Sequence, residues 1–415
     1  MKKMLKLSIP CHIITFVLFF AYVEKVQGAY YVAPDGSDES EGTIGSPWKS
    51  IQHAVNQAES GDVINVREGI YNEMVVISEK EALDDQWITI KNYPNEKPII
   101  DAEGLDITSS KRAGFEINDS VGIRIKGFEI RNLKTDSRKS FPAGILVRGK
   151  NKNIEIVEND IHHIANYSSN GNAHGILVYG DHPQAIENIE ILKNRLRDLT
   201  LGSSESLTLS GNVEHFTVDG NIVYRNNNIG IDIAGRYGAC KSDGCTDYAR
   251  NGVVSNNIVS NISSGENPAY KGYPSAAGIY VDGAQNIVVK NNYVGNSDFG
   301  ISVSSEKKGF SAKNITIKEN YIAMNTKAGL VIGGSDVDNG GAENSSIINN
   351  LFSFNDRIDK GYREITIQNH TRGNEFSGNI YFICGSKGHI NIREKVSADN
   401  RFMDEFVIHR GFCKK

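Results

Sequence analysis

A short pattern recurs along most of this chain and limits what it can fold into. In residues 278–306, GIYVDGAQNIVVKNNYVGNSDFGISVSSE, short runs of alternating apolar residues are broken by Gly, Asn and Asp, and the run GIxV then begins again. Alternation with a period of two, interrupted by turn residues, is typical of strands rather than helices. We therefore expect a repeated unit built from short strands.

One position in each unit sets the length of the repeat. It follows the second strand, and its successive occurrences lie 27 to 36 residues apart. Self-similarity at this spacing indicates a solenoid, and units of about three strands without a helical segment indicate an all-β parallel β-helix. Stacked Asn side chains can exchange hydrogen bonds between coils, so we interpret this position as structural. It is occupied by Gly127, Asn159, Asn194, Asn221, Asn257, Asn292, Asn320, Asn350 and Asn379.

The region before the regular coils differs from them. Apolar residues at Ile51, Ala54, Val55 and Ala58 have helical spacing and predict a short amphipathic helix. Such a helix can cap the end of a solenoid, whose last layer would otherwise expose apolar surface and unpaired strand edges. We expect an N-terminal cap and first coils in residues 29–122, then coils with inserted loops and a C-terminal tail in residues 123–415.

The first 28 residues have the pattern of a secretory signal peptide. Lys2, Lys3 and Lys6 precede an apolar run at residues 13–21, and small residues allow cleavage near Gly28. The run is shorter than the ~20 residues that a spanning helix needs, so a membrane anchor is the weaker interpretation. We expect a secreted protein, extracellular or periplasmic, without a membrane span in the mature chain.

Charge and cysteine content indicate which partners and which disulfides to expect. The formal net charge is −5 without basic runs, which argues against a nucleic-acid partner. Export leaves Cys240, Cys245, Cys384 and Cys413, an even number compatible with two disulfides, Cys240 with Cys245 and Cys384 with Cys413. A metal half-site at the first pair is the weaker alternative. We expect a monomer.

Two loops interrupt the rhythm of the coils, at residues 236–251 and 263–277. Loops often carry function, although they also accept insertions that have none. These two combine Arg, Lys and Tyr, which suit sugar rings and carboxylates. The predicted substrate contacts in them are Arg236, Tyr248, Tyr270 and Tyr273.

Alignment of the GIxV strands predicts which side chains share the outer face. Adjacent strands lie ~4.8 Å apart, so Asp232, Tyr280 and Asp282 should form one patch. His174 precedes Gly175, and Glu205 holds the same position one coil on, so the two could form an acid/base pair that also contacts substrate. A His beside a strand is, however, more often a plain surface residue. The first outward column reads Leu146, Leu177, Thr208, Asp232, Tyr280, Ser302 and Val331.

The opening YYVAPDGSD, the segment SPWKSIQHAVNQAESGDVINVREGIYNE and the repeated GIxVxG/NN coils resemble a known group of proteins. They are similar to secreted right-handed parallel β-helix proteins of the pectin-lyase-like superfamily, near the family 9 polysaccharide lyases. The resemblance implies a right-handed coil, calcium held by clustered Asp residues, and a Lys or Arg base. This chain has single Asp232 and Asp282 where the paired Asp motif of such lyases is expected.

β-Elimination on a uronate polymer needs a neutralised carboxylate, a base and a proton donor. Asp232, Asp282 and Asp247 could supply part of a Ca²⁺ shell, although Asp also caps turns. Arg side chains can pair with carboxylates. The predicted catalytic residues are Lys271, Tyr280, Arg250 and His174.

These observations predict a protein that binds an acidic polysaccharide and cleaves it by β-elimination. A uronate C5-epimerase, which begins with the same proton abstraction, is the closest alternative. A non-catalytic carbohydrate-binding or cell-surface β-helix would have a similar groove. Hydrolysis would be favoured if two carboxylates flank the scissile bond.

Overall fold

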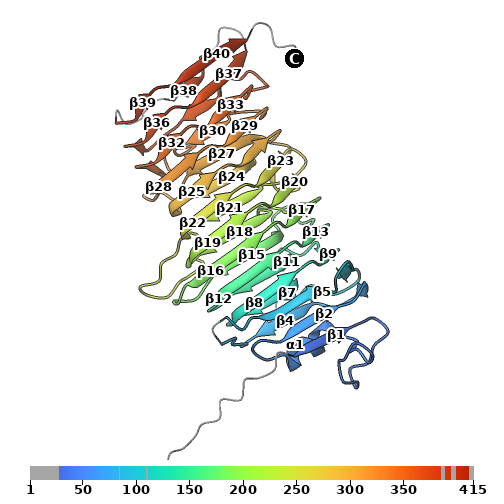
Figure 1. Cartoon of the computed structure of the whole chain (residues 1–415). Helices are drawn as coiled ribbons and strands as arrows, with labels where there is room; N and C mark the ends of the chain where they lie inside the picture. The colour runs from blue at the N-terminus through green and yellow to red at the C-terminus, as the bar shows by residue number, and fades with distance from the viewer. Residues whose placement is uncertain (1–27, 84, 109–110, 385–387, 394–398, 411–415) are drawn as a thin grey trace, which may run out of the picture.

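The computed structural model describes residues 28–83, 85–108, 111–384, 388–393 and 399–410. The predicted signal peptide lies outside these residues apart from Gly28. Short strands stack layer upon layer into an elongated column, with the N-terminal strands at one end and the C-terminal strands at the other (Figure 1). The predicted right-handed parallel β-helix is confirmed.

Three long sheets run along this column. We name them sheet A, sheet B and sheet C, and every strand pair between their coils is parallel and in register. Sheet A contains β1 (Ala29–Val32), β2 (Val63–Val66), β5 (Ile88–Asn92), β8 (Val121–Lys126), β12 (Lys152–Val157), β16 (Ile186–Leu192), β19 (Val213–Asp219), β22 (Arg250–Ser255), β25 (Gln285–Lys290), β28 (Ser311–Lys318), β31 (Gly341–Glu343), β32 (Ser346–Ile348), β35 (Thr371–Arg372), β36 (Glu375–Ser377) and β39 (Arg401–Met403).

Sheets B and C are formed by the strands that precede and follow those of sheet A in each coil. Sheet B contains β4 (Val75–Ser78), β7 (Ala113–Asn118), β11 (Ala143–Arg148), β15 (His174–Gly180), β18 (Leu207–Gly211), β21 (Ile231–Ala234), β24 (Ala277–Asp282), β27 (Phe299–Ser304), β30 (Leu330–Ile332), β34 (Ile365–Ile367) and β38 (Ile390–Ile392). Sheet C contains β3 (Gly69–Tyr71), β6 (Pro98–Asp101), β9 (Glu129–Arg131), β13 (Asp160–His162), β17 (Arg195–Arg197), β20 (Ile222–Asn226), β23 (Ile258–Ile262), β26 (Tyr293–Gly295), β29 (Tyr321–Ala323), β33 (Leu351–Ser353), β37 (Ile380–Cys384) and β40 (Phe406–Arg410). The short strands β10 (Lys134–Thr135) and β14 (Ala165–Asn166) pair beside them.

The core of the column is made of the inward residues of all three sheets. In sheet B these include Ile176, Leu207, Ile231, Ile279 and Ile301, which are fully buried. Because side chains alternate along a strand, the residues between them face outward. The predicted register of the GIxV strands is therefore confirmed.

The Asn ladder is confirmed at the corner between sheets A and C. The Nδ2 of Asn159 donates to Oδ1 of Asn194 at 3.0 Å, and Nδ2 of Asn194 donates to Oδ1 of Asn221 at 3.1 Å. The same contact continues through Asn257, Asn292, Asn320, Asn350 and Asn379. These side chains are buried, so the ladder satisfies polar groups that have no access to water.

The predicted capping helix is present as α1 (Ile51–Gln57). The side chain of Ser50 caps its N-terminus by accepting from the backbone N–H of His53, and Ile51, Ala54 and Val55 are buried against the first coils. In the described part of the chain no helix is long and apolar enough to cross a membrane. Cys240 and Cys245 form the predicted disulfide, while Cys413 lies outside the described residues.

Candidate active site

A cavity of about 530 Å³ opens on the outer face of sheet B. Strands β15, β18, β21 and β24 form its floor, and the loops after β17, β21 and β23 contribute to its walls. Four acidic side chains and no Lys or Arg occur among the described residues that line it. The acids are Glu205, Asp232, Asp282 and Glu306.

The floor follows from the register of the strands. Thr208 of β18 pairs with Asp232 of β21, which pairs with Tyr280 of β24. Asp282 lies two residues after Tyr280 and therefore faces the same side. The predicted patch of Asp232, Tyr280 and Asp282 is brought together as one surface of the cavity.

Asp282 is held by two hydrogen-bond donors. The Tyr237 hydroxyl donates to its Oδ2, and the backbone N–H of Glu306 donates to its Oδ1 at 2.9 Å. Burial, followed by the charge of Glu306, raises the pKa of Asp282 to about 7, against the opposing effect of these donors. Asp282 is therefore ready to exchange a proton near neutral pH.

Asp232 has a different environment. It is buried, and its Oδ1 has no hydrogen-bond partner. Burial and the charges of Glu205, Asp282 and Glu306 raise the pKa of Asp232 well above its usual range. This carboxyl group therefore keeps its proton at a pH where ordinary Asp side chains are ionised.

Glu205 and His174 meet through Thr208. The Thr208 Oγ1 donates to Glu205 Oε2 at 2.9 Å and lies 3.2 Å from His174 Nδ1, whereas His174 Nδ1 and Glu205 Oε2 are 3.9 Å apart. The predicted pair is thus bridged rather than direct. Burial raises the pKa of Glu205 to about 7 and lowers the pKa of His174 to about 4, so the imidazole is neutral.

Tyr270 also reaches the cavity. It ends the short helix η1 (Pro268–Tyr270), and its hydroxyl accepts from Asn228 Nδ2 at 3.0 Å. Lys271, the next residue, is exposed and does not line the cavity. Tyr273 is 62% exposed, and the ammonium of Lys327 lies over its ring.

The remaining predicted residues lie outside the cavity lining. The Arg236 guanidinium contacts the rings of Tyr248 and Phe310, at 4.3 and 4.6 Å from their centroids. Asp247 accepts from the backbone N–H groups of Gly238 and Cys240, which braces the disulfide loop. These contacts hold the loop that carries Tyr237.

Arg250 belongs to β22 of sheet A, not to sheet B. Its Nε lies 2.9 Å from Glu214 Oε2, and its Nη1 donates to Asn212 Oδ1 at 3.0 Å. It lines a separate hollow with these partners.

Tyr237 and Glu306, which contact Asp282, line the cavity but were not among the predicted site residues. Tyr237 follows Arg236 in a loop that the composition did single out, and Glu306 lies two residues beyond Ser304. The Glu306 side chain therefore points to the same side as the outward residues of β27, although the strand ends at Ser304. The alternation of side chains along β27 could therefore have identified Glu306 from the sequence. Tyr237, in contrast, reaches the cavity because its loop folds back over sheet B.

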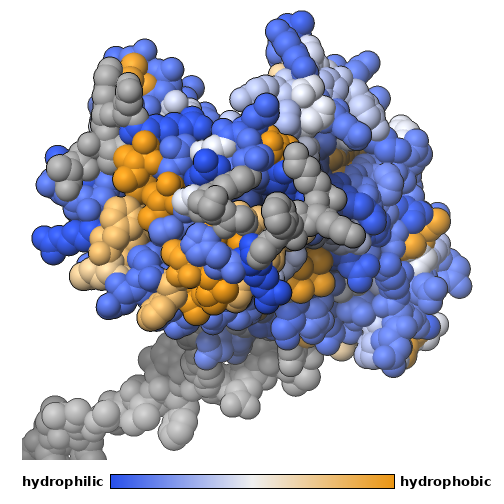
Figure 2. All heavy atoms as spheres, turned by 90° about the horizontal axis from the view of Figure 1, so that it is seen from above, coloured by the Kyte–Doolittle hydropathy of each residue, from blue (hydrophilic) through white to orange (hydrophobic). Residues whose placement is uncertain are grey.

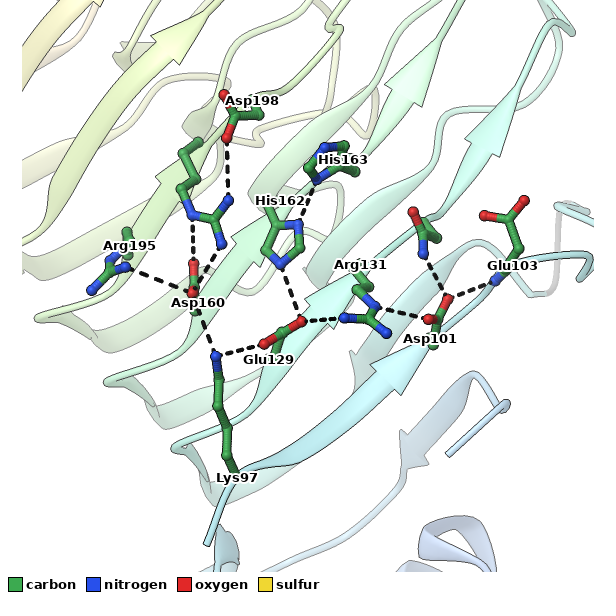
Figure 3. A network of polar contacts seen from close by, with 12 residues as sticks. Lys97, Asp101, Glu103, Glu129, Arg131, Asp160, His162, His163, Arg195 and Asp198 are labelled. Carbon is green, nitrogen blue, oxygen red and sulfur yellow. Dashed lines mark hydrogen bonds and ion pairs between the residues drawn. The ribbon is translucent and has the colours of Figure 1, made fainter. Parts of the chain in front are cut away.

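A second polar cluster lies on the outer face of sheet C (Figure 3). Ligand atoms of Glu129, Asp160 and His162 lie within 4.8 Å of one another. The Lys97 ammonium, however, is 2.5 Å from Glu129 Oε2 and 3.8 Å from Asp160 Oδ2. Arg131 also pairs with Glu129, so cations of the chain already balance the acids, and we interpret the cluster as a structural ion-pair network.

The predicted calcium ligands Asp232, Asp282 and Asp247 do not form a cluster like that on sheet C. Within the described ranges, the cluster on sheet C is the one group of three acidic, His or Cys ligands at metal-binding spacing. Asp232 and Asp282 line the cavity, but the Asp247 carboxylate is used by backbone amides outside it. The residues present do not fit the predicted set of Asp232, Asp282 and Asp247.

Known proteins match the chain over different lengths. Residues 30–195 match the family described as "Pel9A-like, right handed beta helix region". The uncharacterised protein YwoF of Bacillus subtilis is 38% identical over 358 residues, covering 86% of this chain and 75% of that protein. Pectate lyase PEL9 of Emericella nidulans is 42% identical over 76 residues, 18% of each chain.

Among solved structures, the GH136 lacto-N-biosidase of Eubacterium ramulus superposes with a TM-score of 0.61 and 15% identity. The match covers 92% of this chain and 67% of that one. At this identity the similarity concerns the fold alone. The extent of the similarity places the chain in the family of YwoF, and its residues 30–195 form a Pel9A-like right-handed β-helix region.

Proposed function

We propose that this protein hydrolyses glycosidic bonds of a neutral glycan that lies across the outer face of sheet B. The observation that carries the proposal is the set of four acidic side chains in a cavity that no described Lys or Arg lines. Carboxyl groups in environments that favour different protonation states are the usual acid and base of glycoside hydrolysis. Tyr270 and Tyr280 add ring surface and hydroxyl groups against which sugars can bind.

The environments of two carboxyl groups suggest their roles. Asp232 retains its proton and would donate it to the glycosidic oxygen as the bond from that oxygen to the anomeric carbon breaks. Asp282, stabilised as a carboxylate by Tyr237 and the Glu306 amide, would either take a proton from the attacking water or attack the anomeric carbon itself. Water then supplies the hydroxyl group of the new reducing end, and Asp232 is reprotonated.

A uronate fits this cavity less well than a neutral sugar does. Its carboxylate would enter among four acids and would be repelled by those that are ionised, such as the Asp282 carboxylate, because like charges at short range repel strongly in a buried site. Lys307 is a cation that acts on the site from outside it, because its charge lowers the pKa of Asp282. Its ammonium lies over the Tyr237 ring, 4.1 Å from the centroid, and not in the cavity lining.

β-Elimination on an acidic polysaccharide is the second candidate. It is favoured by the segment similar to a pectate lyase and by the neutral, buried His174 imidazole in the cavity. In that reaction His174 would take the proton next to the carboxylate, and Tyr280, whose pKa burial raises, would protonate the leaving oxygen. A C5-epimerase would begin with the same step and return the proton to the carbon.

Product analysis separates these candidates. Residues 29–415 are incubated with neutral and acidic polysaccharides in ¹⁸O-labelled water, and the products are weighed by mass spectrometry. Hydrolysis adds one labelled water per cleaved bond, whereas elimination adds none and creates a double bond that absorbs ultraviolet light. Labelled products from a neutral glycan support the proposal, and unsaturated products from a uronate polymer contradict it.

A further inference from the structure

Lys327, which lies between β29 and β30, is a buried cation. Hydrophilic side chains predominate on the surface seen from the C-terminal end of the column (Figure 2), and Lys side chains on such a surface normally keep their ammonium group in water. Lys327 is only 4% exposed. Removal of a charge from water costs free energy unless other groups take the place of the water. The groups around its ammonium therefore indicate what this Lys does.

Residues 263–277, which we call the Tyr270 loop, supply two of these groups. The Lys327 Nζ donates to the backbone oxygen of Pro274 at 2.6 Å. It also lies over aromatic rings, 4.4 Å from the centroid of Tyr273 and 4.9 Å from that of Phe299 in β27. Contacts of a cation with aromatic rings are strongest when the cation is removed from water. Lys327 thus holds the end of the Tyr270 loop against the coils that follow it.

The other side of the loop is held by the coils that precede it. The Nδ2 of Asn267 donates to the backbone oxygens of Gly202 at 2.7 Å and Asn227 at 2.8 Å. Asn267 lies three residues before Tyr270, and Pro274 lies four residues after it. The segment that carries Tyr270 into the cavity is therefore held on both sides, and the buried ammonium contributes to the second side.

The hydroxyl group of Tyr270 can donate to a molecule in the cavity. It accepts from Asn228 Nδ2 at 3.0 Å, and a phenol oxygen that accepts one hydrogen bond can still donate another. Among the described residues no acceptor for its proton is present. Burial raises the pKa of Tyr270, so the hydroxyl group keeps this proton at neutral pH. A sugar hydroxyl group that enters the cavity can be its acceptor.

We propose that Lys327 is a positioning residue for the substrate. By holding the Tyr270 loop at Pro274, it keeps the Tyr270 hydroxyl group where this group donates a hydrogen bond to a sugar hydroxyl group in the cavity. The inference rests on the proposed glycan substrate, but not on the reaction that the glycan undergoes. A contact made equally in the bound substrate and in the transition state acts on KM rather than on kcat.

The first experiment tests whether Lys327 holds the loop. Lys327→Met keeps the unbranched stem but removes the charge and the donor. The mature chain is treated with trypsin, and mass spectrometry follows cleavage after Lys271, which is exposed beside Tyr270. Because cleavage requires local opening, it should be at least about tenfold faster in Lys327→Met, whereas cleavage after Lys241, exposed in another loop, should not change. An unchanged rate after Lys271 would overturn the proposal.

Lys313→Met is the matched control. The Lys313 side chain belongs to β28 of sheet A, is 40% exposed, and pairs with Glu343 Oε2 at 3.3 Å. Its replacement also removes one ammonium group, but from the side of the column away from the Tyr270 loop. Cleavage after Lys271 and the kinetic constants should both equal those of the wild type.

The second experiment tests whether Lys327 acts through Tyr270. With the glycan that the wild type cleaves, KM should rise about 3- to 10-fold in Tyr270→Phe, the effect of one hydrogen bond, and at least as much in Lys327→Met. In both variants kcat should stay within about twofold of the wild type. Addition of Tyr270→Phe to Lys327→Met should raise KM no further, because the contact is already lost.

The outcomes separate this inference from the proposed function. An unchanged KM in Tyr270→Phe, which keeps the ring and needs no change in the loop, contradicts the inference, as does an additive rise in the double variant. Failure of the proposed function would instead appear as the absence of hydrolytic products from the wild type. Dissociation constants measured by calorimetry would then replace KM, and a wild type that binds no glycan would overturn both.

Discussion

The hydroxyl group of Tyr237 donates a hydrogen bond to Oδ2 of Asp282, a residue 45 positions further along the chain. The same hydroxyl lies 2.9 Å from Glu306 Oε2, so its single proton is shared between two acids of the cavity. The hydrogen bond favours the ionised form of Asp282 and opposes the effect of burial. Tyr237 is therefore a positioning residue for the carboxylate that we assign as base or nucleophile.

Replacement of Tyr237 by Phe tests this relationship. Loss of the donor should raise the pKa of Asp282, so the acidic limb of the pH–rate profile should move to higher pH. We expect kcat to fall about 10- to 100-fold at neutral pH, within the range of general acid–base effects. Tyr273→Phe, which alters an exposed Tyr outside the cavity, should leave the profile unchanged.

The Asp232→Asn substitution should separate activity from stability. The amide keeps the shape of the side chain but has no acidic proton, so kcat should fall by about 10²- to 10⁴-fold. Because the pKa of this carboxyl group is raised by burial, at neutral pH the group is protonated in the folded chain but ionised in the unfolded chain. This difference opposes folding, and the amide removes it. Thermal unfolding near pH 8 should occur at an equal or higher temperature in the variant. A variant that unfolds at a lower temperature would contradict this account.

The stability of the folded chain should decrease as pH rises from about 4 to about 7. Glu205 and Asp282 have pKa values of about 7 in the folded state, whereas unfolded carboxyl groups titrate near 4. Between these values the folded state binds more protons than the unfolded state, so raising the pH favours unfolding, and the effect levels off above the folded pKa. Unfolding temperatures measured from about pH 5 to pH 8 should show this decline. The slope should be smaller in Glu205→Gln and Asp282→Asn.

The Asn ladder should contribute to stability rather than to catalysis. Asn221 Nδ2 donates to Ile191 O at 2.9 Å and to Asn257 Oδ1 at 3.0 Å, and its Oδ1 accepts from Asn194. Asn221→Ala leaves these buried groups without partners, which should cost roughly 2–4 kcal/mol in denaturant unfolding. Asn188→Gly, at an exposed position of β16 with a positive φ, should cost much less. An equal cost in the two variants would mean that burial of the ladder does not matter.

The fold could be predicted because its signals are local and repeated. Each coil presents the same alternation and the same corner Asn, and parallel stacking then fixes which outward residues become neighbours. That reasoning found Asp232 and Tyr280, which occupy equivalent positions in adjacent strands, and Asp282, which lies two residues after Tyr280 on the same face.

Other parts of the site depend on contacts that alternation does not determine. Alternation gives the face of a strand on which Arg250 lies, but the sheet that its strand joins depends on the length of the preceding loop. Tyr237 reaches Asp282 through a loop closed by the Cys240–Cys245 disulfide and braced by Asp247. The path of such a loop is set by these tertiary contacts, so composition indicated the loop but not the residue that enters the cavity.

The most direct test of the central claim is the isotope content of the products formed from a neutral glycan in ¹⁸O-labelled water. We predict one labelled oxygen per cleaved bond for the wild-type protein, the same products at least about 10²-fold more slowly for Asp232→Asn, and unchanged wild-type products in the presence of a metal chelator. Unsaturated, unlabelled products from a uronate polymer that disappear when a chelator is added would contradict the assignment of the cavity acids to hydrolysis.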